Sequence, residues 1–104
     1  MTYKFHWRFW RGLRSVKSDA GFAVEIAGVL RTIYSEPGRS ITFPTKPARL
    51  RSERFMGKAG WVIGLSAPVG WSNDSARMNE TERKLVEERI VAAMEFLKVP
   101  YVLV

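Results

Sequence analysis

The sequence predicts an α+β fold, a curved antiparallel sheet with a C-terminal amphipathic helix packed on it. Three observations support this prediction. Short stretches with the patterns of β-strands, separated by Gly and Pro, fill the region before residue 66. A clear helical period covers residues 79–97, and a short apolar run follows at 101–104. With 104 residues, 46 % of them hydrophobic, the chain suits a single domain, 1–104, with a core of its own.

The first predicted strand covers residues 3–9, where aromatic side chains alternate with Lys, His and Arg. The aromatic residues share one face of the strand, and they are Tyr3, Phe5, Trp7 and Phe9. Two interpretations are open. The aromatic face covers the core, as aromatic rings turned away from charge usually do. Alternatively, it forms a platform on which nucleic-acid bases stack.

Residues 18–34 fit either a helix or two strands broken at Gly28. Gly21 and Gly28 would each cost a helix about 1 kcal/mol, and the β-branched residues of this stretch favour strands. Residues 30–34 and 40–43 then flank Pro37-Gly38, a pair typical of tight turns. This part of the chain therefore predicts a β-hairpin.

After the hairpin, Pro44 and Pro47 are expected to end the strand and open a loop over residues 46–58. The apolar run at 61–65 predicts a buried strand, and the Pro, Gly, Ser and Asn residues of 68–75 predict irregular structure.

The predicted helix has a clear start and a clear buried face. Asn79 is a suitable N-cap, and Glu82, three residues later, completes a capping box. The apolar stripe consists of Val86, Ile90, Ala93 and Leu97, widened by Leu85, Met94 and Phe96. Pro100 ends the helical stretch, and residues 101–104 predict a closing strand.

The charge of the chain is strongly positive and unevenly distributed. The net charge is +7, and twelve of the 17 Lys and Arg residues lie among the first 60 residues, with only four of the ten Asp and Glu residues. A surplus of like charge repels itself unless a partner uses it, and such partners are nucleic acid, an anionic membrane or an acidic protein surface. The chain has no Cys, which suits a reducing compartment. We find neither a secretory leader nor an apolar stretch of about twenty residues that could span a membrane, so we expect a cytoplasmic protein.

The residue types needed for catalysis or metal binding are sparse. His6 is the only histidine and lies on the charged face of a predicted strand. Glu36 and Glu53 are too isolated to form the spaced carboxylates of an acidic nuclease site, and the glutamates of the helix are expected on its solvated face. We therefore expect no catalytic residue, no metal and no cofactor, and a binding protein rather than an enzyme.

The loop at 46–58 is the strongest candidate site, because it carries five cations against one carboxylate. Arg suits paired hydrogen bonds to carboxylate or phosphate. The alternative is a loop that is merely soluble. Trp71, between Gly70 and Ser72, is either an exposed apolar anchor for a partner or a ring that folds back onto the core. The predicted partner-binding residues are Arg39, Lys46, Arg49, Arg51, Arg54, Lys58 and Trp71.

From residue 34 onward the order of elements resembles a family of small bacterial immunity proteins, which protect cells against polymorphic toxins, including those of contact-dependent growth inhibition. The resemblance rests on the hairpin of 33–44 ending in Pro, the apolar strand 60–63, the helix start at 78–83, and residues 95–97 followed by a short terminal strand. It covers the last two-thirds of the chain and leaves the first 30 residues unexplained.

The resemblance implies a tight one-to-one complex with a cognate toxin domain, often a nuclease acting on transfer RNA or DNA, whose active site or substrate surface is covered. No functional residue transfers from the family. Inhibitors of basic nucleases are often acidic, so a chain of net charge +7 would act by placing Arg in the acidic, metal-binding cleft of the nuclease. The alternative function is a nucleic-acid-binding module that uses the N-terminal strand and the 46–58 loop.

Overall fold

The computed structural model describes residues 3–10, 13–27, 31–50, 55–66, 70–71 and 78–104, which form seven strands and one helix. In chain order these are β1 (Phe5–Trp10), β2 (Leu13–Ser18), β3 (Ala23–Ala27), β4 (Arg31–Glu36), β5 (Arg39–Arg49), β6 (Ala59–Ile63), α1 (Glu80–Leu97) and β7 (Tyr101–Leu103). The strands form one sheet in the same order, from β1 at one edge to β7 at the other.

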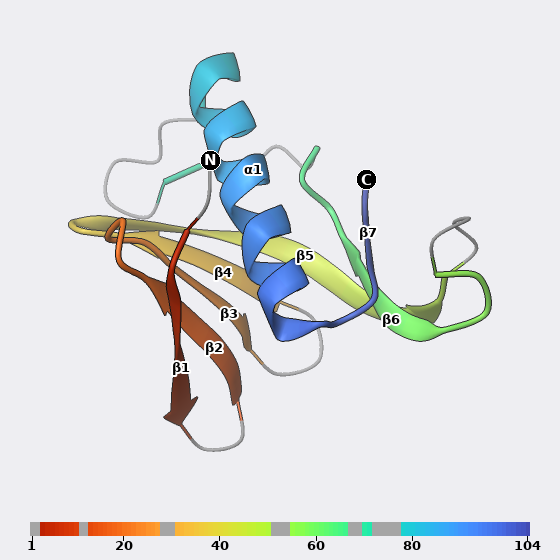
Figure 1. The fold of residues 1–104 in the computed structure, drawn as a ribbon. Helices are drawn as coiled ribbons and strands as arrows, with labels where there is room; N and C mark the ends of the chain where they lie inside the picture. Colours follow the sequence, from red (N-terminus) through yellow and green to blue (C-terminus); the bar gives the residue numbers. More distant parts are fainter. Residues whose placement is uncertain (1–2, 11–12, 28–30, 51–54, 67–69, 72–77) are drawn as a thin grey trace.

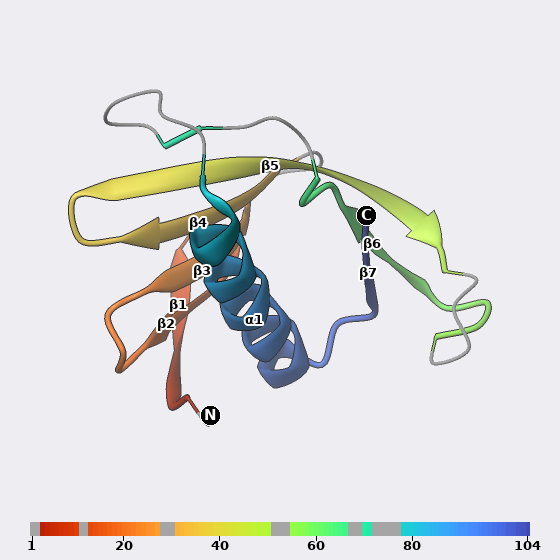
Figure 2. The same ribbon diagram turned by 90° about the horizontal axis from the view of Figure 1, so that it is seen from above.

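The sheet curls around the helix, so that α1 lies against its concave face (Figures 1 and 2). The predicted α+β fold, with a curved antiparallel sheet and a C-terminal helix, is confirmed. The neighbouring strands from β1 to β6 are antiparallel, whereas β6 and β7 are parallel. The parallel pair arises because α1 connects the two strands, and a crossover of that length returns the chain in its original direction.

The described residues of the ambiguous stretch at 18–34 form strands and a turn rather than a helix, as its β-branched residues favoured. Residues 23–27 form β3, and β4 begins at Arg31, while Gly28 lies outside the described residues. The predicted hairpin is confirmed too, since Glu36 pairs with Arg39 across the Pro37-Gly38 turn. Gly38 has a φ of 85°, the positive value that a type II turn needs at this position.

The long strand β5 contradicts the prediction that Pro44 and Pro47 end it. Its first part pairs with β4 as far as Pro44, and its second part pairs with β6 on the opposite side from Thr45 onward. Pro47 lies opposite Trp61, whose N–H is directed away from β5 and donates to Pro100. This pair exchanges no ladder hydrogen bond, so the missing N–H of Pro47 costs the sheet nothing.

The second part of β5 and its partner β6 project beyond the part of the sheet that α1 covers (Figures 1 and 2). We call residues 45–50 and 55–63 the arm. Of the predicted 46–58 loop, residues 46–49 therefore form the end of β5, whereas residues 55–58 are a turn and a short link that lead into β6 at Ala59; residues 51–54 lie outside the described residues.

The core lies between α1 and the concave face of the sheet. The predicted helix stripe is buried at Val86, Ile90, Ala93 and Leu97, and Met94 is buried beside it. Leu85 and Phe96 were expected to widen the stripe but are 41 % and 36 % exposed. The predicted capping box is present, because Asn79 accepts from the Glu82 N–H and Glu82 accepts from the Asn79 N–H.

The start of β1 favours the core interpretation of its aromatic face. The ring centroids of Tyr3 and Phe5 lie 5.1 and 5.8 Å from that of Phe22, which is buried. These two rings are packed against the core and are not a free stacking platform. The side chains of Trp7 and Phe9 lie outside the described residues. No helix in the described part of the chain is long and apolar enough to cross a membrane.

Candidate functional site

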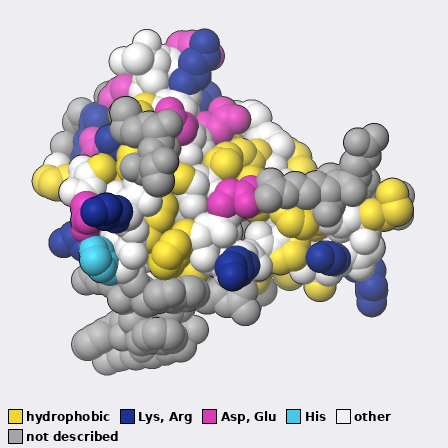
Figure 3. Space-filling model, viewed as in Figure 1, with side chains coloured by type: hydrophobic (Ala, Val, Ile, Leu, Met, Phe, Trp, Pro, Cys, Tyr) yellow, Lys and Arg dark blue, Asp and Glu magenta, His cyan; other side chains and the backbone are white. Residues whose placement is uncertain are grey.

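The arm carries three of the predicted partner-binding residues, Lys46, Arg49 and Lys58, and all three are exposed. Lys46 and Arg49 are three positions apart on β5, and successive side chains of a strand point to opposite faces. The arm therefore presents positive charge on both faces. Dark blue Lys and Arg side chains are visible along it at the right of Figure 3.

The charges of the arm are not neutralised within the described structure. Residues 45–50 and 55–63 contain no Asp or Glu, and neither Lys46 nor Lys58 has an ion-pair partner among the described residues. Arg49 donates from Nη1 to the carbonyl of Gly57 at 3.3 Å, a contact that leaves its charge unpaired. The arm is thus a projecting element of one sign of charge.

The end of the arm is held by backbone hydrogen bonds. Leu50, which is buried, donates its N–H to Lys58 at 2.9 Å and accepts from the N–H of Gly57 at 2.8 Å. Met56 nearby is 74 % exposed, so an apolar side chain stands in solvent beside the cations. Arg51 and Arg54, the two other predicted cations of this segment, lie outside the described residues.

Arg39 was predicted to bind a partner, but the structure brings it into an intramolecular cluster. Its Nε donates to Glu36 at 2.5 Å, and its Nη1 lies 3.0 Å from a carboxylate oxygen of Glu82. Its guanidinium carbon also lies 3.7 Å from the ring centroid of Trp71. Arg39 therefore ties the β4–β5 turn to the first turn of α1.

A second arginine completes this cluster from the middle of the helix. Arg89 donates to the hydroxyl of Tyr34 at 2.8 Å, and Tyr34 donates to Glu36 at 2.8 Å. Burial raises the pKa of Tyr34 to about 12. Burial alone would also raise the pKa of Glu36, but hydrogen bonds from Arg39 and Tyr34 outweigh it and lower that pKa below its usual value.

The prediction of Trp71 as an exposed anchor is wrong, and the alternative, a ring folded back onto the core, is confirmed. Trp71 is only 3 % exposed. Its ring lies under Arg39 and 6.2 Å from the ring of Tyr34, so it is covered by the same cluster. The indole N–H is buried without a hydrogen-bond partner.

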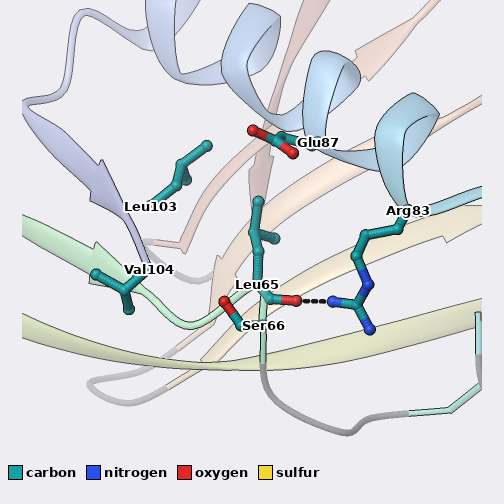
Figure 4. A pocket seen from close by; sticks show the side chains of 6 residues that line it. All are labelled: Leu65, Ser66, Arg83, Glu87, Leu103 and Val104. Atoms are coloured by element: carbon teal, nitrogen blue, oxygen red, sulfur yellow. Dashed lines mark hydrogen bonds between the residues drawn. The ribbon is translucent and has the colours of Figure 1, made fainter. Parts of the chain in front are cut away.

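A shallow depression lies between α1 and the end of β7 (Figure 4). The charged side chains that line it are Arg83 and Glu87 from the helix, and Ser66 lies on the opposite side with Leu65 and Leu103. Arg83 donates to the carbonyl of Leu65, as the dashed line in Figure 4 shows. This hydrogen bond links the helix to the segment that follows β6, so the Arg83 guanidinium has a structural role here.

The remaining polar groups do not assemble into a reaction centre within the described residues. His6 lies 2.7 Å from Asp19, and both side chains are exposed. No group of three His, Asp or Glu residues that could hold a metal ion occurs in the described part of the chain.

The chain matches no family model, no curated protein and no solved structure. The proposed function therefore rests on the surface features of the protein described above.

The cluster around Glu36 is the feature that sequence reasoning missed, since Glu36 was considered isolated. One signal was available. Glu36 and Arg39 flank a two-residue turn, and such positions face each other across a hairpin. The contacts of Arg89 and Trp71 depend on tertiary packing and have no local signal.

Proposed function

We propose that this protein is an immunity-type inhibitor, which neutralises a cognate toxin domain by one-to-one binding in the cytoplasm and catalyses nothing itself. The arm is the contact surface, and it covers the active site or substrate surface of the toxin. The observation that carries the proposal is the arm itself, a projecting strand pair whose exposed Lys46, Arg49 and Lys58 have no carboxylate beside them in the described structure.

The proposal is supported by the contrast between two sets of cations. Arg39 forms intramolecular ion pairs with Glu36 and Glu82. Arg89 donates a hydrogen bond to the Tyr34 hydroxyl. Within the described residues the arm cations make no such contacts, so an external anionic surface would relieve their mutual repulsion. An acidic cleft, such as the metal-binding site of a nuclease, is a surface that a narrow cationic arm fits.

One feature of the arm favours a protein partner over nucleic acid. Met56 is 74 % exposed beside Lys58, and Met is enriched at protein interfaces. Nucleic-acid surfaces that track a single strand instead use exposed aromatic rings for base stacking. Tyr3 and Phe5, two residues of the predicted stacking platform, contact Phe22 in the core.

The proposal predicts that a large secreted protein with a toxic C-terminal domain is encoded immediately upstream of this chain, and the neighbouring reading frame tests this first. Co-expression of the chain should then protect cells from that domain, and the purified pair should saturate at one to one. The triple variant Lys46→Glu, Arg49→Glu and Lys58→Glu should weaken the complex by at least tenfold, because it places carboxylates against an acidic partner.

The matched control reverses three exposed lysines away from the arm, Lys4, Lys17 and Lys84, and so changes the net charge by the same amount. Equal affinity of the two triple variants would rule out the arm as the contact. A single-stranded oligonucleotide bound below micromolar concentration, with affinity that falls steeply as salt rises, would favour the nucleic-acid alternative.

A further inference from the structure

The base of the arm has a small apolar hollow on the face opposite the core. The hollow has a volume of about 240 Å³ and is lined by Pro44, Thr45, Lys46, Val62, Gly64 and Val104. Pro44 is exposed, and Val104 is 57 % exposed, so apolar surface faces solvent here. Gly64 keeps the hollow open, because a Cβ at this position would lie 3.0 Å from a ring carbon of Pro44.

The polar groups of the hollow are few and mostly satisfied. The Thr45 hydroxyl donates to the Phe43 carbonyl at 3.2 Å and lies 2.7 Å from the Thr32 hydroxyl. The carbonyl of Pro44 accepts from the N–H of Gly64 at 2.8 Å. Lys46 is thus the one charged side chain among the lining residues, and it has no ion-pair partner in the described structure.

A second cation stands next to the hollow. Arg31 pairs with Pro44 across the β4–β5 ladder, and residues paired in this way point to the same face of a sheet. Arg31 is exposed and, within the described residues, it also has no ion-pair partner. An apolar hollow is therefore flanked by Arg31 on one strand and Lys46 on the next.

We propose that this hollow takes an aliphatic or aromatic side chain from an acidic segment of the protein partner, with carboxylates on both sides of that side chain facing Arg31 and Lys46. The apolar side chain fills the space over Val62 and Gly64, and the carboxylates neutralise the two free cations. The inference rests on the proposed function, because the hollow is continuous with the arm through Lys46. It adds the chemistry of the partner segment.

The test uses three short acetylated peptides as probes, each with two charged residues on either side of a central one. The first places leucine between Asp and Glu residues, the second replaces that leucine with serine, and the third places leucine between lysines. Binding is followed by the methyl signals of Val62 and Val104 in carbon-edited NMR spectra. The acidic leucine peptide should shift both signals saturably, the serine peptide should bind at least fivefold more weakly, since a buried leucine is lost, and the lysine peptide should not bind.

Two variants separate the hollow from general charge attraction. Val62→Asp should abolish binding of the acidic leucine peptide, and Val104→Asp, at a more exposed position, serves the same purpose if Val62→Asp fails to fold. Leu85→Asp, on the exposed face of α1, is the matched control and should leave binding unchanged. Equal affinities for the leucine and serine peptides, or stronger shifts of the same methyl signals by a single-stranded oligonucleotide, would overturn the inference.

The outcomes also distinguish this inference from the proposed function. If Val62→Asp and Val104→Asp leave toxin protection intact while the triple reversal on the arm abolishes it, the hollow is not used and the proposed function stands. If the peptide binds as expected but neither the wild-type protein nor any variant protects cells, the hollow is a binding site and the inhibitor function fails.

Discussion

The guanidinium of Arg39 stacks on the indole of Trp71, with its central carbon 3.7 Å from the ring centroid. The same guanidinium bridges Glu36 in the β4–β5 turn and Glu82 in the first turn of α1. The Arg39 side chain therefore connects the β4–β5 hairpin, the start of α1 and the segment between β6 and α1. Two residues that looked suited to a partner instead hold the fold together.

Replacing Trp71 by Ala should reduce the free energy of unfolding by about 3 to 5 kcal/mol, because a large buried aromatic ring leaves a cavity. Urea unfolding followed by circular dichroism measures the loss. Met56→Ala is the control, because it removes an exposed apolar side chain of the arm and should cost almost nothing. A loss at Trp71 as small as that at Met56 would mean that the ring is not part of the core.

Glu36→Gln should reduce the loss of unfolding free energy that occurs as the pH falls from 7 to 3. The pKa of Glu36 is lowered in the folded protein, so its contribution is present at neutral pH and is lost as the pH falls below 4.5, the ordinary value, and through the folded value. At pH 7 the variant should be less stable by about 1 to 3 kcal/mol, because Tyr34 and the two arginines lose a charged acceptor. Unfolding free energies measured from pH 7 to pH 3 should converge for the two proteins. Parallel curves would contradict the assignment.

Tyr34 should contribute to the pH dependence of the free energy of unfolding at alkaline pH, where its stabilising effect is lost as the pH rises. Its pKa is raised to about 12 in the folded protein, so the stability it contributes is full below pH 10 and is lost as the pH rises through the folded value. Tyrosinate absorbance near 295 nm should show a step close to pH 12 in the folded protein. The variant Tyr34→Phe should lack this step, and a titration unchanged by the substitution would refute the assignment.

Local patterns were sufficient to predict most of the fold. The helix bounds, the Asn79–Glu82 capping box and the hairpin around Gly38 each depend on residues close in sequence, and each is present. The course of β5 could not be predicted in this way. Whether a proline breaks a strand depends on which side the neighbouring strand lies, and β5 changes its paired side between Pro44 and Thr45.

The candidate site was predicted only in part for a similar reason. Lys46, Arg49 and Lys58 are exposed on one projecting element, as their density in the sequence indicated. Arg39 was also predicted to bind a partner, yet Glu36 in the adjacent turn and Glu82, more than forty residues later, both pair with it. Composition shows where charge is abundant, whereas only tertiary packing decides which charges stay free.

The buried hydroxyls of Thr32 and Thr45 should respond unequally to removal. They lie 2.7 Å apart where β5 changes its paired side, and Thr45 also donates to the Phe43 carbonyl. Thr45→Val should cost about 1 to 3 kcal/mol, because the Thr32 hydroxyl loses its acceptor while buried. Thr32→Val should cost less, because Thr45 keeps its bond to Phe43. The double variant should be less destabilised than the sum of the two, as chemical unfolding of all four proteins would show, and strict additivity would argue that the hydroxyls do not interact.

Gly60 should tolerate no side chain, because β7 approaches β6 closely at this point. A Cβ at residue 60 would overlap the backbone carbonyl of Pro100 and would lie 2.8 Å from a methyl carbon of Leu50. The Pro100 carbonyl also accepts from the N–H of Trp61 at 3.0 Å, so it cannot move away without weakening the β6–β7 pair. Gly60→Ala should therefore destabilise the protein by about 1 to 3 kcal/mol through overpacking.

Gly64→Ala is the matched comparison, since its nearest contact is a ring carbon of Pro44 at 3.0 Å, and it should cost less. Thermal unfolding of the two variants side by side measures the difference, and amide exchange at Trp61 should rise only in Gly60→Ala. Equal melting temperatures, with Trp61 equally protected in both, would show that a Cβ at residue 60 does not collide with the Pro100 carbonyl.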